Sequence, residues 1–164
     1  MTVKPAAGEP ERSLTSPPAV PKTSFASSEA ARRRMQTQRR VGTGPELAVR
    51  RAAHRLGLRF FVNRRPLPGL RRTADLVFPA ARVAVFVDGC FWHGCPVHAR
   101  GTIRKNTWYW PEKIASNRRR DDDTDARLQA EGWLPLRIWE HEHPTDAALR
   151  IQASVGKRRR RTVA

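Results

Sequence analysis

Residues 73–88, TADLVFPAARVAVFVD, contain the clearest strand pattern in this 164-residue sequence. Val83–Val87 is continuously apolar, which is typical of a strand buried on both faces. Thr73–Phe78 is also mainly apolar, and the four residues Pro79–Arg82 are few enough to join the two strands as a hairpin. The segment therefore predicts two adjacent strands of a buried sheet.

Helix and strand signals on both sides of this hairpin predict an α/β domain. The tripeptide Gly44-Pro45-Glu46 begins a helix, because proline and an acidic side chain both suit a first turn, and Gly57 ends it. Further strands are expected at residues 59–63 and 133–139, and further helices at residues 111–130 and 144–155. The order α-β-β-β-α-β-α predicts a mixed β-sheet flanked by helices.

The charge of the chain points to a polyanionic partner. The sequence has 32 Lys+Arg against 15 Asp+Glu, a formal net charge of +17, which is typical of nucleic-acid binding. Residues 1–30 are rich in Pro, Ser and Ala without an apolar period, so we expect a disordered N-terminal tail, and residues 156–164 are expected to form a disordered basic tail.

Several protein classes are excluded by what the sequence lacks. No apolar run approaches the roughly 20 residues that span a bilayer, and no secretory signal is recognised at the start. Two cysteines do not make a disulfide framework. We therefore expect no membrane association. We also expect the protein to be a monomer.

Cysteines and histidines between the third strand and the next helix suggest a metal site. Cys90, Cys95 and His98 have C-x4-C-x2-H spacing, and His141 and His143 follow near the last strand. Zn²⁺ takes four such ligands in a tetrahedron, and it would stabilise a loop, residues 89–107, that has little apolar content. The alternative is that Cys90 is a small buried hydrophobe and Cys95 an ordinary thiol.

Acidic residues near the strand ends suggest a second, catalytic metal site. Asp75 lies in an otherwise apolar strand, where a carboxylate is costly unless it is paired or binds a metal, and Asp88 ends the next strand. Two carboxylates beside a basic surface suit a Mg²⁺-dependent phosphodiesterase. The alternatives are an ion pair of Asp75 with Arg71 or Arg72, and a capping or turn role for Asp88.

One histidine and one helical aspartate are candidates for proton transfer. His93 follows Cys90 by three residues and is either a fifth metal candidate or a general base. Asp121 shares a helix face with Ile114 and Leu128, which turns it toward the sheet.

Aromatic residues near the same loop are candidates for DNA contact. Phe91, Trp92 and Trp110 lie outside the strands, where aromatic rings on a basic surface can stack on bases or wedge between them. The alternative for Trp110 is packing over the helix.

The segment Gly-Cys-Phe-Trp-His at residues 89–93, after a strand ending in Phe-Val-Asp, resembles the very short patch repair (Vsr) endonucleases, bacterial enzymes that nick DNA beside T·G mismatches. The similarity covers residues 31–143 and includes these further blocks: RMQTQRR (34–40), GTGPEL (42–47), LPG (67–69), ADLVF (74–78), YWPEKI (109–114), Asn117 with Asp121, GW (132–133) and IWE (138–140). The resemblance implies the restriction-endonuclease-like α/β fold with a zinc-stapled loop.

The resemblance also implies roles for individual residues. Asp75 matches the family's Mg²⁺ carboxylate, His93 its catalytic histidine and Asp121 an acidic helper. The remaining matches are the acidic Glu46 near the metal, the zinc ligands Cys90, Cys95 and His141, the DNA-intercalating aromatics Phe91, Trp92 and Trp110, and residues 31–43 as an N-terminal arm against DNA.

Two departures from the family pattern bear on the site. Known members have a histidine where this chain has Asp88, which leaves Asp88 as a candidate metal or water ligand in place of a second catalytic histidine. The zinc loop has fewer histidines, so His98 is assigned as the fourth ligand by spacing, ahead of His143, and His141 replaces a cysteine. Both substitutions keep a zinc-competent set.

These observations combine into a hypothesis of a Mg²⁺-dependent endonuclease with a structural Zn²⁺. We expect it to nick one strand of mismatched double-stranded DNA at T·G pairs, in the cytoplasm of a bacterium, at the nucleoid. The alternatives are a DNA nickase of other or no specificity on the same fold, and a non-catalytic zinc-stapled DNA-binding protein.

Overall fold

The computed structural model describes Arg33, residues 41–98 and residues 108–163. The expected N-terminal tail, and all but a few residues of the expected arm at 31–43, lie outside the described residues. The elements run in this order: α2 (Gly44–Arg55), β1 (Phe61–Arg64), β2 (Ala74–Phe78), the 3-10 turn η1 (Pro79–Ala81), β3 (Val83–Asp88), α3 (Tyr109–Ala130), β4 (Leu134–Trp139) and α4 (Pro144–Val163).

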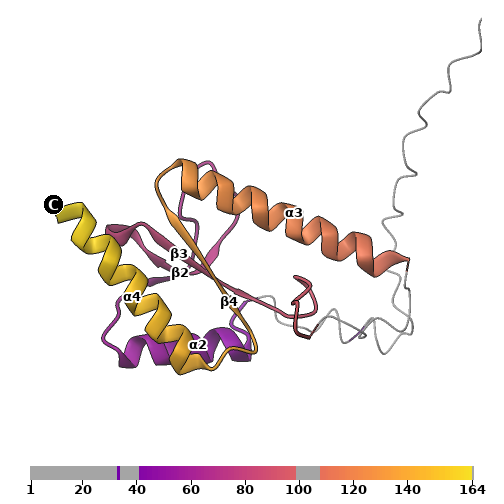
Figure 1. Ribbon diagram of the computed structural model, residues 1–164, viewed down its shortest axis with the longest axis horizontal. Coiled ribbons are helices and arrows are strands. Elements are labelled where there is room, and N and C mark those ends of the chain that lie inside the picture. Colours follow the sequence, from indigo (N-terminus) through magenta and orange to yellow (C-terminus); the bar gives the residue numbers. More distant parts are fainter. Residues whose placement is uncertain (1–32, 34–40, 99–107, 164) are drawn as a thin grey trace, which may run out of the picture.

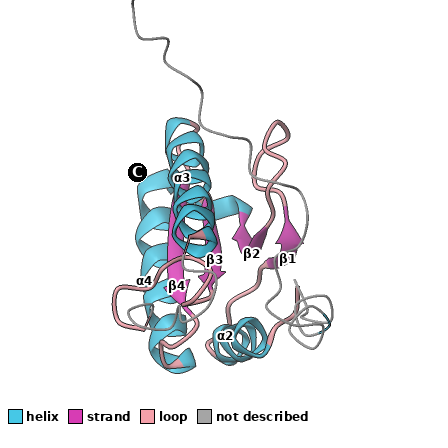
Figure 2. Cartoon of the chain, turned by 90° about the vertical axis from the view of Figure 1, so that its right-hand side faces the viewer, coloured by secondary structure: helices cyan, strands magenta, loops and turns pink. Residues whose placement is uncertain are grey.

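The four strands form one mixed sheet in the order β1-β2-β3-β4, as Figure 2 shows. Strands β1, β2 and β3 are antiparallel neighbours, whereas β3 and β4 are parallel and joined through α3. The predicted hairpin of β2 and β3 is confirmed, with Phe78 opposite Val83. The predicted mixed α/β architecture is confirmed as well.

Helices cover both faces of the sheet (Figure 1). Helices α2 and α4 pack together on one face, where small residues such as Ala53 and Ala148 let them approach the buried Leu76 and Ile138. Helix α3 covers the other face through Leu128, which packs with side chains of β2 and β3. The sheet is therefore a rigid middle layer that fixes the positions of residues at its strand ends.

The C-terminal boundary predicted from sequence is wrong. Instead of a helix over residues 144–155 followed by a disordered tail, α4 is continuous from Pro144 to Val163. One of its basic residues has partners that a free tail would lack, since the Arg158 guanidinium donates hydrogen bonds to the carbonyl oxygens of Ala81 and Gly132. Arginine is also a good helix former, so a charged run need not end a helix.

The other boundaries differ from expectation by one or two residues. The edge strand β1 begins at Phe61, and α3 begins at Tyr109, two residues before the proline that the sequence suggested as its start. Among the described residues, no helix combines the length and the apolar character that crossing a membrane requires.

Candidate active site and metal site

Three of the predicted acidic residues meet at one end of the sheet. Asp75 is the second residue of β2 and Asp88 the last of β3, and antiparallel pairing brings these positions to the same end. Glu46 reaches this end from the first turn of α2. Arg50, one helical turn later, connects two of them, since its Nη2 lies 3.1 Å from Glu46 Oε2 and 3.8 Å from Asp75 Oδ1.

The surroundings of Asp75 disfavour its negative charge. Burial raises the pKa of Asp75 to about 6, and the charge of Glu46 adds to this, while a hydrogen bond from the Val87 amide (2.7 Å) and the charge of Arg50 oppose it. Such a site gains from a bound cation, and carboxylate oxygens are the donors that a hard divalent cation such as Mg²⁺ prefers. The residues present therefore fit a divalent metal.

The alternative partners predicted for Asp75 are wrong. Its cationic neighbour is Arg50 and not Arg71 or Arg72, and Arg72 instead pairs with Asp123 on α3 at 2.5 Å.

His93 and Asp121 form the closest polar pair near this end of the sheet. His93 Nδ1 lies 2.5 Å from Asp121 Oδ2 and 3.8 Å from Asp88 Oδ1. Burial would raise the pKa of Asp121, but the hydrogen bond to His93 and the charge of Arg137 lower it below its usual range. Asp121 is therefore ionised and suited to orient the imidazole, whose Nε2 has no hydrogen-bond partner among the described residues.

Sequence reasoning missed two arginines that contact these acids. Arg50 follows Glu46 by four residues, a spacing that places the two side chains together on a helix. Arg137 is the single charged residue of strand β4, and its guanidinium binds both oxygens of Asp88 at 2.9 Å. The available signal for Arg137 was a single charged residue in an otherwise apolar strand, the same kind of signal that identified Asp75.

The four predicted zinc ligands converge. Ligand atoms of Cys90, Cys95, His98 and His141 all lie within 4.8 Å of one another, and both cysteines are free thiols. Sulfur-to-Nδ1 distances range from 3.1 Å for the pair Cys90–His141 to 3.9 Å for the pair Cys95–His98. A tetrahedral Zn²⁺ with its usual bond lengths places sulfur and nitrogen ligands about 3.5 Å apart. The cluster could therefore hold a metal ion, and His143 is not part of it.

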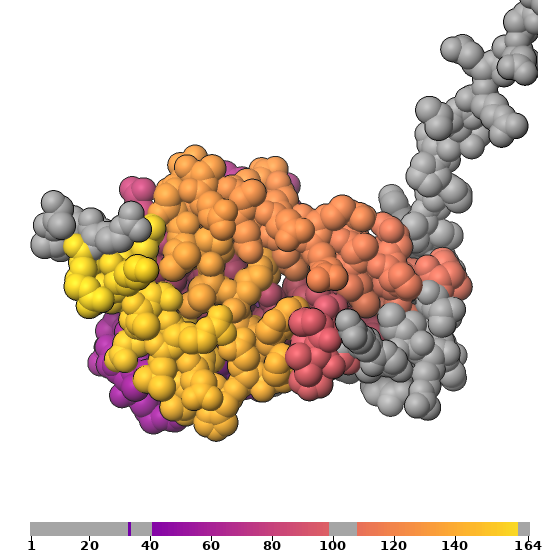
Figure 3. All heavy atoms as spheres, in the orientation of Figure 1, coloured from indigo at the N-terminus to yellow at the C-terminus, as the bar shows by residue number. Residues whose placement is uncertain are grey.

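Further contacts fasten the loop that carries His93. The Asn117 side chain on α3 donates to the Trp92 carbonyl oxygen at 2.8 Å, and the Cys90 amide donates to Glu140 Oε1 at 2.6 Å. Gly94 lies against α3 with a φ of +65°, where a Cβ atom would come within 2.8 Å of Ile114 Cγ2. Figure 3 shows the last described part of this loop, up to residue 98, at the molecular surface below the N-terminal part of α3.

The three predicted DNA-contacting aromatics form one cluster. Phe91 packs edge-to-face on Trp92 and Trp110, with ring centroids 5.3 and 4.8 Å apart, and the two tryptophans are 5.8 Å apart. All three rings are partly exposed. The cluster adjoins His93 in sequence, so an aromatic surface borders the acidic end of the sheet.

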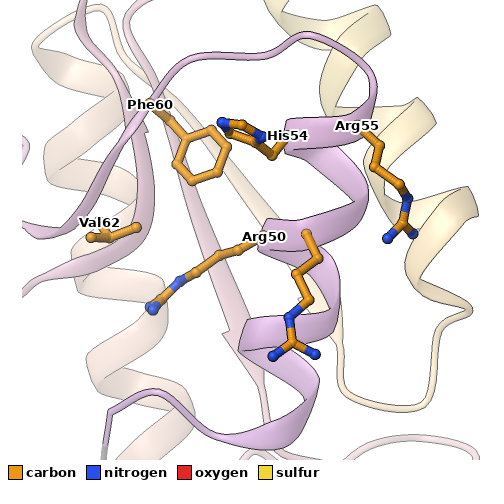
Figure 4. Close-up of a pocket in the computed structure, with 6 residues that line it drawn as sticks. Arg50, His54, Arg55, Phe60 and Val62 are labelled. Atoms are coloured by element: carbon orange, nitrogen blue, oxygen red, sulfur yellow. The ribbon is translucent and has the colours of Figure 1, made fainter.

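A basic concavity is lined by Arg50 and other residues of α2, of the segment that leads into β1 and of β1 itself. It has a volume of about 420 Å³, and Figure 4 shows Arg50, His54 and Arg55 of α2 on one side of it and Phe60 and Val62 on the other. Only Arg50 of its lining touches the carboxylates described above, so the concavity is separate from the acidic cluster.

Comparison with known proteins gives consistent matches. A family model described as DNA mismatch endonuclease Vsr matches residues 26–98. The type II nicking enzyme V.NaeI of Lentzea aerocolonigenes is 45% identical over 122 residues, which is 73% of this chain and 72% of that protein. The type II nicking enzyme V.XorIIP of Xanthomonas oryzae is 43% identical over 116 residues (71% and 83%), and the DNA mismatch endonuclease Vsr of Escherichia coli K12 is 35% identical over 124 residues (71% and 78%).

Proposed function

Since the chain belongs to the Vsr family of DNA mismatch endonucleases, we propose that it nicks one strand of double-stranded DNA at T·G mismatches in a Mg²⁺-dependent reaction. Family membership makes it a DNA endonuclease and disfavours the alternative of a non-catalytic DNA-binding protein. The proposal includes action on DNA in the bacterial cytoplasm, at the nucleoid, by a monomer.

The cluster of Glu46, Asp75 and His93 with Asp121 is the observation that carries this proposal. Asp75, with Glu46 nearby, would hold Mg²⁺, which when bound neutralises charge on the scissile phosphate and favours ionisation of the attacking water. His93 would accept the proton of that water at Nε2 while the water oxygen forms its bond to phosphorus. The P–O bond to the leaving oxygen of the strand breaks, and that oxygen takes a proton from solvent. Asp121 holds Nδ1–H and stabilises the resulting imidazolium.

The Cys90, Cys95, His98 and His141 cluster is proposed to hold a structural Zn²⁺. Its donor set of two thiols and two imidazoles suits zinc, and it leaves no open ligand position for chemistry. Its role is to fix the ends of the loop that carries His93 and the aromatics.

The aromatic cluster is proposed to enter the DNA stack beside the mismatch. Phe91, Trp92 and Trp110 are partly exposed and adjoin the catalytic loop, and a mismatched pair costs less to unstack than a matched one. The residues 31–43 are proposed to form an arm against the DNA.

The test is a nicking assay on labelled duplexes that contain a T·G mismatch, other mismatches or no mismatch, each in several flanking sequences. We expect Mg²⁺-dependent nicking of one strand only in the T·G duplexes. Asp75→Ala should abolish nicking and leave DNA binding within about threefold of wild type, because it removes a metal ligand and no DNA contact. Asp122→Asn is the matched control, since Asp122 is an exposed acid of α3.

Two results would contradict the proposal. Undiminished Mg²⁺-dependent nicking by Asp75→Ala would reject the catalytic assignment. Equal nicking of matched and T·G duplexes would instead favour a nickase of different specificity. This alternative is consistent with the names of the relatives, which are type II nicking enzymes.

A further inference from the structure

A partly buried arginine, Arg137, contacts four acceptor groups close to His93: the carboxylates of Asp88, Asp125 and Asp121 and the carbonyl oxygen of Asp121. Arg137 Nη1 donates to both carboxylate oxygens of Asp88 at 2.9 Å, and Nε and Nη2 donate to the two oxygens of Asp125 at 3.0 and 3.1 Å. Nη2 also lies 3.3 Å from the Asp121 carbonyl oxygen and 3.4 Å from its Oδ1. One guanidinium thus joins β3, β4 and α3.

The sheet register places Arg137 there. Arg137 pairs with Phe86 across the parallel strands β3 and β4, so its side chain lies on the same face as those of Phe86 and Asp88. That face is the one covered by α3, which supplies Asp121 and Asp125. The Arg137 guanidinium carbon lies 5.0 Å from the Phe86 ring centroid, so the ring packs against the guanidinium and limits its movement toward the sheet.

The same contacts decide what Asp88 can do. Its side chain is only 6% exposed, and both oxygens are engaged by Arg137. Asp88 differs in this respect from Asp75, because the Arg50 guanidinium lies 3.8 Å from Asp75 Oδ1 and does not bind both carboxylate oxygens.

We propose that Arg137 is a positioning residue for His93: it fixes Asp121 through its carbonyl and carboxylate oxygens and occupies Asp88, so that His93 Nδ1 bonds to Asp121 and Nε2 is left for the reacting water. Asp88 is then a counter-ion of Arg137 and not a ligand of metal or water. The inference rests on the proposed function, because it gives His93 its orientation in that reaction.

The first test compares Arg137→Met and Arg137→Lys with wild type in single-turnover nicking of the T·G duplex at saturating Mg²⁺. We expect the Arg137→Met rate to fall by about 100-fold with DNA affinity changed less than about threefold, because a misplaced catalytic group lowers the rate and not binding. Arg137→Lys should recover only part of the rate, since an ammonium cannot bind Asp88 and Asp125 together.

The Asp88→Asn and Asp88→Asn/Arg137→Met variants separate positioning from simple charge balance. The double variant leaves no uncompensated Asp88 charge and should regain thermal stability relative to Arg137→Met, but its nicking rate should stay low, because Asp121 is still not held. Asp88→Asn should leave the half-saturating Mg²⁺ concentration unchanged. Recovery of nicking in the double variant to within about threefold of wild type, or a large rise in that Mg²⁺ concentration, would overturn the inference.

Two further measurements guard against a merely structural effect. Val155→Ala, a buried change in α4 on the other face of the sheet, is the control for lost stability and should keep its nicking rate. The proton NMR signal of the His93 Nδ1–H in its 2.5 Å hydrogen bond, assigned by its loss in His93→Gln, should vanish or move in Arg137→Met and persist in Val155→Ala. An unchanged signal in Arg137→Met would overturn the inference. Because this signal needs no DNA, it remains informative even if wild type fails to nick T·G duplexes, a result that would reject only the proposed function.

Discussion

Asp75 is a residue whose ionised form the folded protein disfavours. Its side chain is 21% exposed, and burial together with the charges of Glu46 and Asp88 raises its pKa to about 6. A carboxylate in an apolar strand is costly unless it is paired or binds a metal, and the proposed function has Asp75 bind a metal. The folded chain without Mg²⁺ therefore carries an electrostatic penalty at this position near neutral pH.

This penalty predicts that Asp75→Asn stabilises the protein. Between the ordinary carboxyl pKa of 3.8 and the folded value of about 6, the folded state binds a proton that the unfolded state does not, so the free energy of unfolding falls as the pH rises through this window. Asparagine does not titrate and can still accept the Val87 hydrogen bond. We expect Asp75→Asn to be more stable at about pH 7.5 by on the order of 1–3 kcal/mol, with a smaller difference at about pH 5.

Chemical denaturation in Mg²⁺-free buffer measures this effect, with Asp122→Asn as the exposed control. Asp121→Asn should show the opposite sign, since the pKa of Asp121 is lowered in the folded state. A destabilised Asp75→Asn at the higher pH would show that the Arg50 attraction outweighs burial.

Among the elements, the loop between β3 and α3 has backbone hydrogen bonds of its own, from the His93 and Cys95 amides to the Gly89 and Cys90 carbonyl oxygens, and other segments of the chain hold it as well. Asn117 of α3 binds the Trp92 carbonyl, Glu140 after β4 binds the Cys90 amide, and Gly94 lies directly against α3. His93 is positioned by this loop, so its placement depends on how closely Gly94 approaches the helix.

Gly94→Ala should therefore impair catalysis more than DNA binding. The new Cβ would meet Ile114 Cγ2 at 2.8 Å, and the positive φ of +65° is unfavourable for alanine, so the loop must shift. We expect the nicking rate to fall by at least about tenfold, because small displacements of a catalytic group have large effects. Single-turnover nicking and duplex binding by the same protein measure the two properties.

Gly156→Ala in α4 is the matched control for this substitution. A Cβ at Gly156 meets only Arg160 Nη1, at 3.9 Å, and alanine is a better helix former than glycine, so this variant should be stabilised by about 0.5–1 kcal/mol with unchanged nicking. A Gly94→Ala protein with the wild-type rate would mean that the Gly94–Ile114 approach does not position His93.

At the scale of the whole molecule, the metal cluster connects segments that the chain separates by more than 40 residues. Cys90 and Cys95 follow β3, whereas His141 follows β4, and the four ligands meet where these parallel strands end. A metal bound there would join the loop that carries His93 to the sheet and would contribute its binding free energy to folding.

Removing the metal should loosen this end of the molecule. We expect purified protein to contain about one Zn²⁺ per chain, and a zinc-selective chelator at saturating Mg²⁺ to lower Tm by several degrees and to abolish nicking. In the chelated protein both Cys90 and Cys95 should react with a thiol reagent, and in the zinc-loaded protein neither should. Metal-free native protein with two reactive thiols would reject the zinc site.

Much of the fold follows from local patterns in the sequence. The apolar runs predicted β2 and β3, Pro45 and Glu46 predicted the start of α2, and the order of helices and strands predicted a mixed sheet, since periodicity and turn chemistry act over a few residues. The end of α4 was not predictable in this way, because the Arg158 side chain finds its carbonyl partners 26 and 77 residues away.

The sequence by itself determined which residues are available for chemistry: a carboxylate in an apolar strand, the Gly-Cys-Phe-Trp-His motif, and a short set of thiols and imidazoles. Only the tertiary structure decided how they combine. It brought His98, and not His143, close to Cys90, Cys95 and His141. It also placed His93 beside Asp121 and paired Asp88 with Arg137, a residue 49 positions away on a neighbouring strand. The physical reason is that ion pairs and metal sites depend on distances of a few ångströms between side chains, and strand register and helix packing set those distances.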